Sequence, residues 1–556
     1  MTLDGRWGTR QVHYRRAGSG PLLLLLHQSP QSSRELVPLM DMWSQQFTIV
    51  APDSPGYGLS DPLGVDEAVL SDFADAIMEF MDAIGAGKFG IYGVHTGGMI
   101  GTAVADGYPE RVTALACNGV LIPTDEELEE LLAEYLPAFE PRWDGGHLAW
   151  LWGKTREQTI FFPWYNRTLE GRMDFSMPSP EHQQNSVLEM FRSGDQYRVA
   201  YRAAFVFHAD VVIPRLQVPA LFTAADWDPL QFHLARIYSC PDCVHIVESA
   251  TPVEALERCL ELLTANIGDE LPAVPLPEPV VGRLWKQLVK TDVGELLVRR
   301  GGELTAPAVV IVHGAGGSSA TVAALAESLA DNFHVIAIDL PGHGESDCPI
   351  ADGGPTVEVC AQAVGAVIDA LGTAKLALLG IAGGALIALE FASTSHERVL
   401  QTVLFDVPDL TEAEQNAWRT HGLPSMAPDW WGGHLLRCWH MVRDGRLYFP
   451  WFQRDQDGIR WQEPEVDDDS IQLEVSEYLK AEGAWQALLG HQLDYPLHDK
   501  LSAPGASVIC CATKSSPWRS KTERAAVNAG KTFQELPDDV DDMKAALSAL
   551  LANGVQ

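Results

Sequence analysis

An internal repeat constrains the fold of this chain more than any other feature of its sequence. The letters PGYG at 55–58 recur as PGHG at 341–344, which is 286 positions later. Four further features of the first half recur 287 positions later: MDAIG at 81–85, Gly93, GGHL at 145–148 and FPW at 162–164. Five matches at an almost constant spacing predict a tandem duplication, with one structural unit in each half.

A proline-rich segment separates the two copies. Four prolines stand between Leu271 and Pro279. Prolines are excluded from helix interiors and central strands, and a run of them favours an extended, stiff chain. We therefore predict one domain at residues 1–268, a linker at 269–282 and a second domain at 283–556.

The composition limits the possible partners. With 556 residues and a formal net charge of −36, the chain lacks the excess of Lys and Arg that binding to nucleic acid or to an anionic membrane requires. Its nine cysteines show no repeated spacing, which favours reduced thiols over a disulfide framework. The sequence also contains no apolar run of membrane-spanning length and no export signal. We expect a cytoplasmic protein directed at a small-molecule substrate, and the sequence does not predict its oligomeric state.

Each copy alternates apolar strands with amphipathic helices. Continuous apolar runs at 22–27 and 309–313 are typical of strands buried on both faces, and helical periodicity follows at 69–84 and 357–371. This order predicts the α/β class, with a mostly parallel sheet flanked by helices in each half.

The turn between a predicted strand and a predicted helix in the first half departs from a known catalytic motif at one position. The segment Gly93-Val94-His95-Thr96-Gly97 has the layout G-x-S-x-G of a nucleophile elbow, but His95 stands in place of the serine. In the second half the same position is Ala382.

Each half resembles the α/β-hydrolase superfamily. Besides the elbow, the resemblance is carried by HG-type loops, HQSP at 27–30 and HGAG at 313–316, and by the turns DSPGYGLS at 53–60 and DLPGHGES at 339–346. The resemblance implies two tandem α/β-hydrolase-like domains, each with a helical cap insertion. It also implies a catalytic triad in the order nucleophile, acid, histidine.

The second half lacks all three members of such a triad. Ala382 has no nucleophilic group, residues 512–518 contain no carboxylate, and residues 535–540 contain no histidine. We predict that this half is a pseudoenzyme, which could still bind a ligand.

The first half keeps part of a site. Asp226 and Asp228 follow the strand at 220–223, so either could be the acid, whereas the expected histidine loop at 246–252 has no histidine. An imidazole at the elbow is longer than a serine side chain and projects into the gap that the missing histidine leaves. His95 is therefore predicted to pair with Asp228 or Asp226, which would raise its pKa and fix one tautomer.

Further residues are candidates for binding the substrate. The backbone N–H of Thr96 would point at a developing oxyanion, and a second N–H could come from Gln28 or Ser29. His147 and Trp164 lie in the expected cap. Their copies persist in the half without a triad, which favours a structural role over substrate binding.

The leading hypothesis is an enzyme acting on a small, largely apolar ester, thioester or ketone, with His95 as base or nucleophile. No metal or organic cofactor is implied. A lyase or isomerase with His95 as base is a close alternative, since it needs a proton acceptor but no acyl acceptor. The other alternative is a non-catalytic pseudohydrolase that binds a small ligand or a protein.

Overall fold

The computed structural model describes residues 1–174, 176–273, 279–348, 353–503 and 507–552, and it divides into two compact units. The first unit comprises Met1–Glu140 and Trp150–Glu278, and the second comprises Pro141–Ala149 and Pro279–Gln556. The division after Glu278 falls inside the predicted linker, of which residues 274–278 lie outside the described residues. The segment Pro141–Ala149 differs from the prediction, which placed it in the first domain.

The first unit is built on a seven-stranded sheet of order β3-β5-β4-β6-β7-β8-β9, in which every pairing except that of β3 with β5 is parallel. A separate two-stranded sheet, β1-β2, precedes it. The strands of the unit are β1 (Thr2–Gly5), β2 (Gly8–Gln11), β3 (Tyr14–Ala17), β4 (Leu22–Leu26), β5 (Thr48–Pro52), β6 (Phe89–Val94), β7 (Val112–Asn118), β8 (Ala220–Ala225) and β9 (Val244–Ser249).

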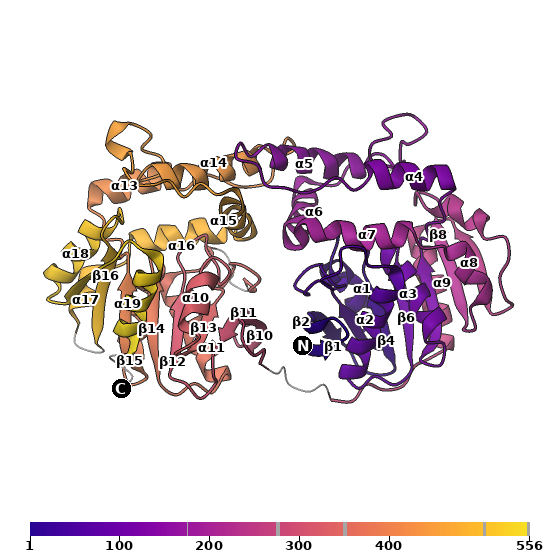
Figure 1. The fold of residues 1–556 in the computed structure, drawn as a ribbon, viewed down its shortest axis with the longest axis horizontal. Helices are drawn as coiled ribbons and strands as arrows, with labels where there is room; N and C mark the ends of the chain where they lie inside the picture. The colour runs from indigo at the N-terminus through magenta and orange to yellow at the C-terminus, as the bar shows by residue number, and fades with distance from the viewer. Residues whose placement is uncertain (175, 274–278, 349–352, 504–506, 553–556) are drawn as a thin grey trace. The chain divides into compact units, whose positions relative to one another are not determined.

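Helices cover both faces of this sheet (Figure 1). Leu23 and Leu25 pack on one face with residues of α1 and α9, while Gly101 of α3 lies against Leu26 on the other. The α-helices are α1 (Val37–Trp43), α2 (Leu70–Ala83), α3 (Thr96–Gly107), α4 (Asp125–Glu134), α5 (Gly146–Gln158), α6 (Pro180–Ser193), α7 (Tyr197–Phe205), α8 (Ala209–Val212) and α9 (Pro252–Ala265).

The second unit repeats this topology with one more strand. Its eight-stranded sheet has the order β10-β11-β13-β12-β14-β15-β16-β17, so the parallel part from β13 to β17 corresponds to β5 through β9. The strands are β10 (Trp285–Thr291), β11 (Gly294–Gly301), β12 (Ala308–Val312), β13 (His334–Ile338), β14 (Leu376–Ile381), β15 (Val399–Phe405), β16 (Val508–Thr513) and β17 (Thr532–Leu536).

The helices of the second unit follow the same plan. They are α10 (Ala323–Leu329), α11 (Val357–Ala370), α12 (Gly384–Thr394), α13 (Glu412–His421), α14 (Gly433–Leu447), α15 (Asp468–Lys480), α16 (Ala484–Leu493), α17 (Leu497–Ser502), α18 (Arg519–Asn528) and α19 (Val540–Ala552). The predicted tandem α/β fold, with parallel strands buried on both faces, is therefore confirmed.

Helices α4 to α8 lie between β7 and β8 and form the expected cap insertion of the first unit. The cap begins at Thr124, whose hydroxyl accepts the N–H of Glu127 while the Glu127 carboxylate accepts the N–H of Thr124. This reciprocal capping box satisfies two backbone donors at the start of α4. Helix α5 crosses the boundary between the units, because its residues up to Ala149 group with the second.

Candidate functional site

The elbow of the first unit has the strained backbone of a nucleophile turn. His95 connects β6 to α3 with a φ of 48°, a region that L-residues rarely adopt. Its flanking glycines permit the turn: a Cβ on Gly97 would lie 2.2 Å from the carbonyl oxygen of Leu26, and one on Gly93 would lie 2.4 Å from that of Gly97. The G-x-H-x-G spacing therefore raises the imidazole above the carboxyl end of the sheet.

The imidazole reaches the carboxylate of Asp228. The His95 Nε2 and Asp228 Oδ2 atoms are 2.9 Å apart, across the space in which the usual triad histidine is missing. Gly119 leaves room for the ring, since a Cβ there would lie 2.2 Å from His95 Cδ2.

Of the two candidate aspartates, the structure brings only Asp228 to His95. The second oxygen of Asp228, Oδ1, accepts the backbone N–H of Leu230 at 2.8 Å, which fixes the carboxylate plane. Asp226 is exposed and its Oδ1 accepts a hydrogen bond from Gln231 at 2.8 Å. The two residues are separated by one position, and their side chains point to different surroundings.

The pairing assigns the protons of the imidazole. A carboxylate only accepts hydrogen bonds, so in neutral His95 the Nε2 atom carries the proton and Nδ1 holds the lone pair. Within the described part of the chain, Nδ1 has no hydrogen-bond partner, and the ring lines a cavity. The arrangement thus presents a basic nitrogen to a bound molecule.

The electrostatics of the pair favour its charged form. Burial lowers the pKa of His95, but the charge of Asp228 and the hydrogen bond to it outweigh burial, and the pKa lies above the ordinary 6.5. Burial raises the pKa of Asp228, and here too the partner prevails, so that this pKa lies below the ordinary range.

Two residues that line the same cavity as His95 have backbone N–H groups without acceptors among the described residues: Thr96, the first residue of α3, and Ser29. The N–H of Gln28, the other predicted donor, is occupied, because it donates to Glu35 Oε1 at 2.7 Å. Of the two alternatives from sequence, Ser29 is the one whose N–H is available.

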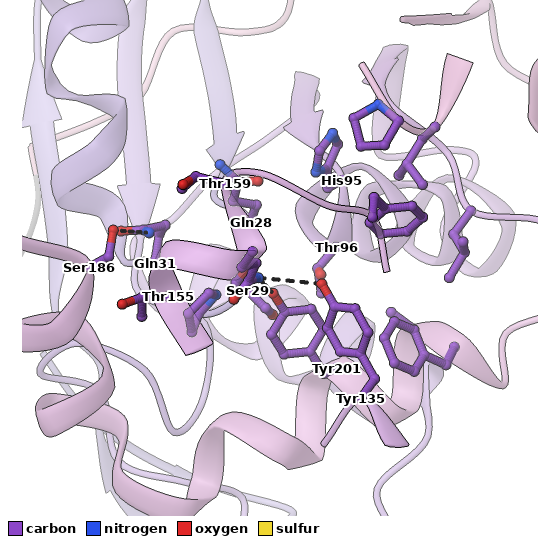
Figure 2. A pocket seen from close by; sticks show the side chains of 18 of the residues that line it. Gln28, Ser29, Gln31, His95, Thr96, Tyr135, Thr155, Thr159, Ser186 and Tyr201 are labelled. Atoms are coloured by element: carbon purple, nitrogen blue, oxygen red, sulfur yellow. Dashed lines mark hydrogen bonds between the residues drawn. The ribbon is translucent and has the colours of Figure 1, made fainter. Parts of the chain in front are cut away.

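These groups lie around a cavity of about 360 Å³ under the cap (Figure 2). Its wall combines apolar side chains with polar ones, and the cap contributes four aromatic side chains, Tyr135, Phe162, Tyr201 and Phe205. The lining residues are Gln28, Ser29, Pro30, Gln31, His95, Thr96, Met99, Leu121, Tyr135, Thr155, Gln158, Thr159, Phe162, Met173, His182, Ser186, Tyr201, Ala204, Phe205, Trp227, Pro229 and Leu230.

Two predicted substrate-binding residues are not among them. His147 is buried in the second unit, where its Nε2 lies 2.7 Å from Gln472 Oε1 and its ring packs against Trp439. Trp164 stands behind the wall and donates from Nε1 to the carbonyl of Tyr135 at 3.2 Å. Both side chains contact other parts of the protein, as expected for the structural role that the sequence favours.

Sequence reasoning missed Glu35, which lies in the short 3₁₀-helix η1 (Ser33–Leu36). Its carboxyl accepts the N–H of Gln28 and also the Gln28 amide at 3.0 Å. Burial raises the pKa of Glu35 to about 7 despite these bonds. The signal in the sequence was Gln28 itself, which stands where the second copy has Gly314.

The corresponding place in the second unit holds different groups. Ala382 keeps the strained turn with a φ of 50°. Asp406 stands directly after β15, as Gly119 stands after β7, and its carboxylate accepts the hydroxyl of Ser516 at 2.7 Å. This pair contains no imidazole, in agreement with the loss of triad residues seen in the sequence.

The described residues contain no group of three or more His, Cys, Asp or Glu side chains placed to hold a metal ion. None of the helices formed by those residues is long and apolar enough to cross a membrane.

A family model described as alpha/beta hydrolase fold matches residues 21–230 and 307–431. Among curated proteins, the chain is 30% identical over 124 residues to an (E)-2-((N-methylformamido)methylene)succinate hydrolase of Acinetobacter baylyi, a match that covers 22% of this chain and 47% of the relative. It is 34% identical over 118 residues to a fluoroacetate dehalogenase of a Burkholderia species, covering 20% of this chain and 38% of the relative. The chain therefore spans less than half the length of these curated relatives.

The two solved structures described next each match about half of the chain. Epoxide hydrolase A from Mycobacterium thermoresistibile is 19% identical, with 48% of this chain and 98% of that chain covered and a TM-score of 0.40. The enol-lactonase from Burkholderia xenovorans is 18% identical, with 48% and 99% covered and a TM-score of 0.35.

Proposed function

This chain belongs to the α/β hydrolase fold family, and we propose that its first unit is an enzyme that acts on a small carbonyl compound through His95 and Asp228. The observation that carries the proposal is the 2.9 Å pairing of these side chains at the elbow. Nδ1 of the imidazole has no hydrogen-bond partner among the described residues, and His95 lines the cavity. An ester, thioester or ketone is the substrate class that such a site fits.

The proposed reaction begins with the carbonyl oxygen between the N–H groups of Thr96 and Ser29. Nδ1 either attacks the carbonyl carbon, or removes a proton from a water molecule that attacks it. In both routes the carbonyl π electrons move to oxygen, where the two N–H groups stabilise the negative charge. His95 becomes positively charged, and the Asp228 carboxylate stabilises that charge.

Hydrolysis is completed when the tetrahedral centre expels the alcohol or thiol. In the water route, the proton taken up by Nδ1 passes to this leaving group. In the nucleophilic route, the expelled alkoxide or thiolate takes a proton from water, and the acyl group remains on Nδ1 of an imidazole that still carries its Nε2 proton. The hydroxide so formed adds to the acyl carbon, the C–N bond breaks, and the acid and neutral His95 are released. This chemistry uses only side chains and backbone groups of the site, so the proposal includes no metal and no organic cofactor.

A second candidate reaction is proton transfer without hydrolysis, as in a lyase or isomerase. The observation that favours it is the loss of a hydroxyl at the elbow while the base and the N–H donors remain. Nδ1 would remove a proton next to the carbonyl, and the resulting enolate oxygen would accept from Thr96 and Ser29. Incorporation of solvent deuterium into unhydrolysed substrate distinguishes this reaction from hydrolysis.

The second unit is proposed to be non-catalytic. Its elbow residue is Ala382, and the nearby carboxylate of Asp406 bonds a hydroxyl and not an imidazole. We therefore regard this unit as a pseudohydrolase, which would bind a small ligand or a protein without converting it.

The experiment that tests the proposal is a turnover screen of esters, acyl thioesters and small ketones with the full chain and with His95→Ala. We expect product release or deuterium exchange that disappears in the variant. His182→Ala is the matched control, since His182 lines the same cavity but forms no hydrogen bond with Asp228 among the described residues, and it should retain turnover. Equal activity in wild type and His95→Ala, or no activity in either, would contradict catalysis by His95 and favour a non-catalytic binding protein.

A further inference from the structure

A buried lysine lies directly behind the wall of the cavity in the first unit. The Lys154 side chain belongs to α5, and the residue is only 3% exposed. Burial lowers its pKa to about 8, so it is mostly cationic near neutral pH. Its Nζ lies 5.4 Å from the ring centre of Tyr197 and 5.9 Å from that of Trp164.

No carboxylate accompanies this ammonium group in the part of the chain that the structure describes. Buried charges in proteins are generally paired, because the loss of hydration costs several kcal/mol per ion. The two aromatic faces offset part of this cost. An uncompensated buried cation next to a cavity is therefore poised for a negative charge that the protein itself does not supply.

Gln158 connects Lys154 to the cavity. The ammonium group donates to Gln158 Oε1 at 3.2 Å, and since ammonium cannot accept a hydrogen bond, this contact fixes the orientation of the amide. The Nε2 end must then face the phenols of Tyr201, at 3.0 Å, and Tyr135, at 3.4 Å. Gln158, Tyr135 and Tyr201 all line the cavity.

The orientation leaves a donor directed at the bound molecule. The Tyr201 hydroxyl donates its proton to the carbonyl oxygen of Ser29 at 2.7 Å. The Tyr135 hydroxyl accepts from Gln158 and also lies beside the Tyr201 hydroxyl. Because the Tyr201 proton is donated to Ser29, the Tyr135 proton can be donated to the Tyr201 oxygen or to a bound molecule. Tyr135 is buried, and burial raises its pKa to about 12, so the phenol keeps this proton near neutral pH.

We propose that this end of the cavity binds a carboxylate of the substrate, with the Tyr135 hydroxyl donating to it and Lys154 supplying the opposite charge through Gln158. The inference deepens the proposed function, on which it rests, by naming a carbonyl compound that also carries a carboxylate. The described lining residues include no Asp or Glu that would repel such a group.

The test compares two probes of nearly equal shape, 4-fluorophenylacetate and 4-fluorophenylacetamide, whose binding to the full chain is measured by fluorine NMR. The wild type should bind the carboxylate about tenfold more tightly than the amide, as expected for one charge-assisted contact. Lys154→Met, which keeps the apolar stem, should bind both probes equally, and Lys154→Arg should recover part of the preference. Tyr135→Phe should reduce the preference while leaving the charge in place.

The matched control is Arg167→Met. Arg167 also lies 5.9 Å from the Trp164 ring, but it is exposed and pairs with Glu157. Removing it should leave the preference unchanged. Near-ultraviolet circular dichroism establishes that each variant is folded before its affinities are compared.

The preference should also persist in His95→Ala, which separates this inference from the proposed chemistry. A carboxylate preference that depends on Lys154 without any turnover would leave the anion site standing and remove the catalytic proposal. Turnover with no carboxylate preference, or a preference unchanged in folded Lys154→Met, would overturn the anion site alone. Failure of both probes to bind the wild type would also count against it.

Discussion

At the scale of single residues, replacing a serine hydroxyl by an imidazole changes how far the elbow reaches. The ring of His95 spans the distance that a separate histidine would fill and contacts Asp228 directly. One side chain, that of His95, thus occupies the elbow and also takes the place of the triad's proton acceptor. The imidazole needs space, and only a glycine at position 119 leaves that space.

Gly119→Ala tests this space requirement. The residue has a φ of 82°, and its new methyl carbon would lie 2.2 Å from His95 Cδ2. We expect a loss of about 1–3 kcal/mol in the free energy of unfolding and displacement of the imidazole, with loss of turnover. Chemical denaturation and activity assays measure the two effects. Gly153→Ala, where no atom lies within 4 Å of the new carbon, is the control; equal behaviour of the two variants would contradict the steric argument.

At the scale of elements, the loop from β4 into η1 distinguishes the active candidate from its copy. In the first unit Gln28 and Glu35 hold the loop by two hydrogen bonds, at positions where the second unit has Gly314 and Thr321. Both loops keep a structural histidine: His27 Nε2 accepts the N–H of Ser54, and His313 Nε2 accepts that of Leu340. The loop scaffold is therefore shared, and the carboxyl group of Glu35 is specific to the first unit.

Glu35→Gln tests the state of this carboxyl. Because burial raises the folded-state pKa from 4.5 to about 7, the folded protein holds the proton more tightly than the unfolded chain. The stability that this provides is complete below about 4.5 and is lost as the pH rises through about 7. The unfolding free energy of wild type should therefore fall relative to Glu35→Gln by about 1–3 kcal/mol over this window.

Denaturant titrations at several pH values measure this difference. Glu126→Gln, which removes an exposed carboxyl of α4, is the control for the loss of one charge. A difference between wild type and Glu35→Gln that is flat across the window would mean that Glu35 is ionised throughout.

The strands and helices were predictable because local patterns specify them. The five leucines of β4 are all buried, and α2 and α11 lie within one or two residues of their predicted ends. The pairing of His95 with one of two aspartates was also predictable from spacing. The choice between them was not, because it depends on the direction of the chain after β8, where the Leu230 N–H fixes Asp228.

Contacts between residues that are far apart in the chain could not be predicted from the sequence. Lys154, Gln158, Tyr201 and Ser29 form one hydrogen-bonded series whose ends in the sequence, Ser29 and Tyr201, are 172 positions apart. No local pattern relates Ser29 to the other three. The surroundings of His147 could not be predicted either. The repeated GGHL motif does not indicate in which unit the imidazole is buried.

At the scale of the whole molecule, two units of one topology differ in the chemistry above their sheets. The first places an imidazole and a carboxylate at the elbow, and the second places Ala382, Asp406 and Ser516 there. Duplication preserved the strained turn in both, with φ near 50° at His95 and at Ala382. The fold is thus retained in each unit, while among the described residues an imidazole–carboxylate pair stands at the elbow of the first unit and a carboxylate–hydroxyl pair lies near that of the second.

Asp406→Asn tests this division of roles. Burial raises the pKa of Asp406 from 3.8 to about 6, so its stabilising contribution is lost as the pH rises through about 6. Above that pH the variant should be more stable than wild type by about 1–2 kcal/mol, because Asn tolerates the positive φ and can still accept from Ser516. Turnover should stay within about twofold of wild type. Loss of turnover in folded Asp406→Asn would contradict the assignment of catalysis to the first unit.

The measurement that tests the central claim most directly is nitrogen NMR of histidine-labelled protein as a function of pH, in wild type, Asp228→Asn and the control Asp226→Asn. We expect His95 to be the Nε2–H tautomer with a pKa above 6.5. Asp228→Asn should lower this pKa, and Asp226→Asn should leave it unchanged. A proton on Nδ1 of neutral His95, or a pKa insensitive to Asp228→Asn, would contradict the pairing on which the proposed chemistry rests.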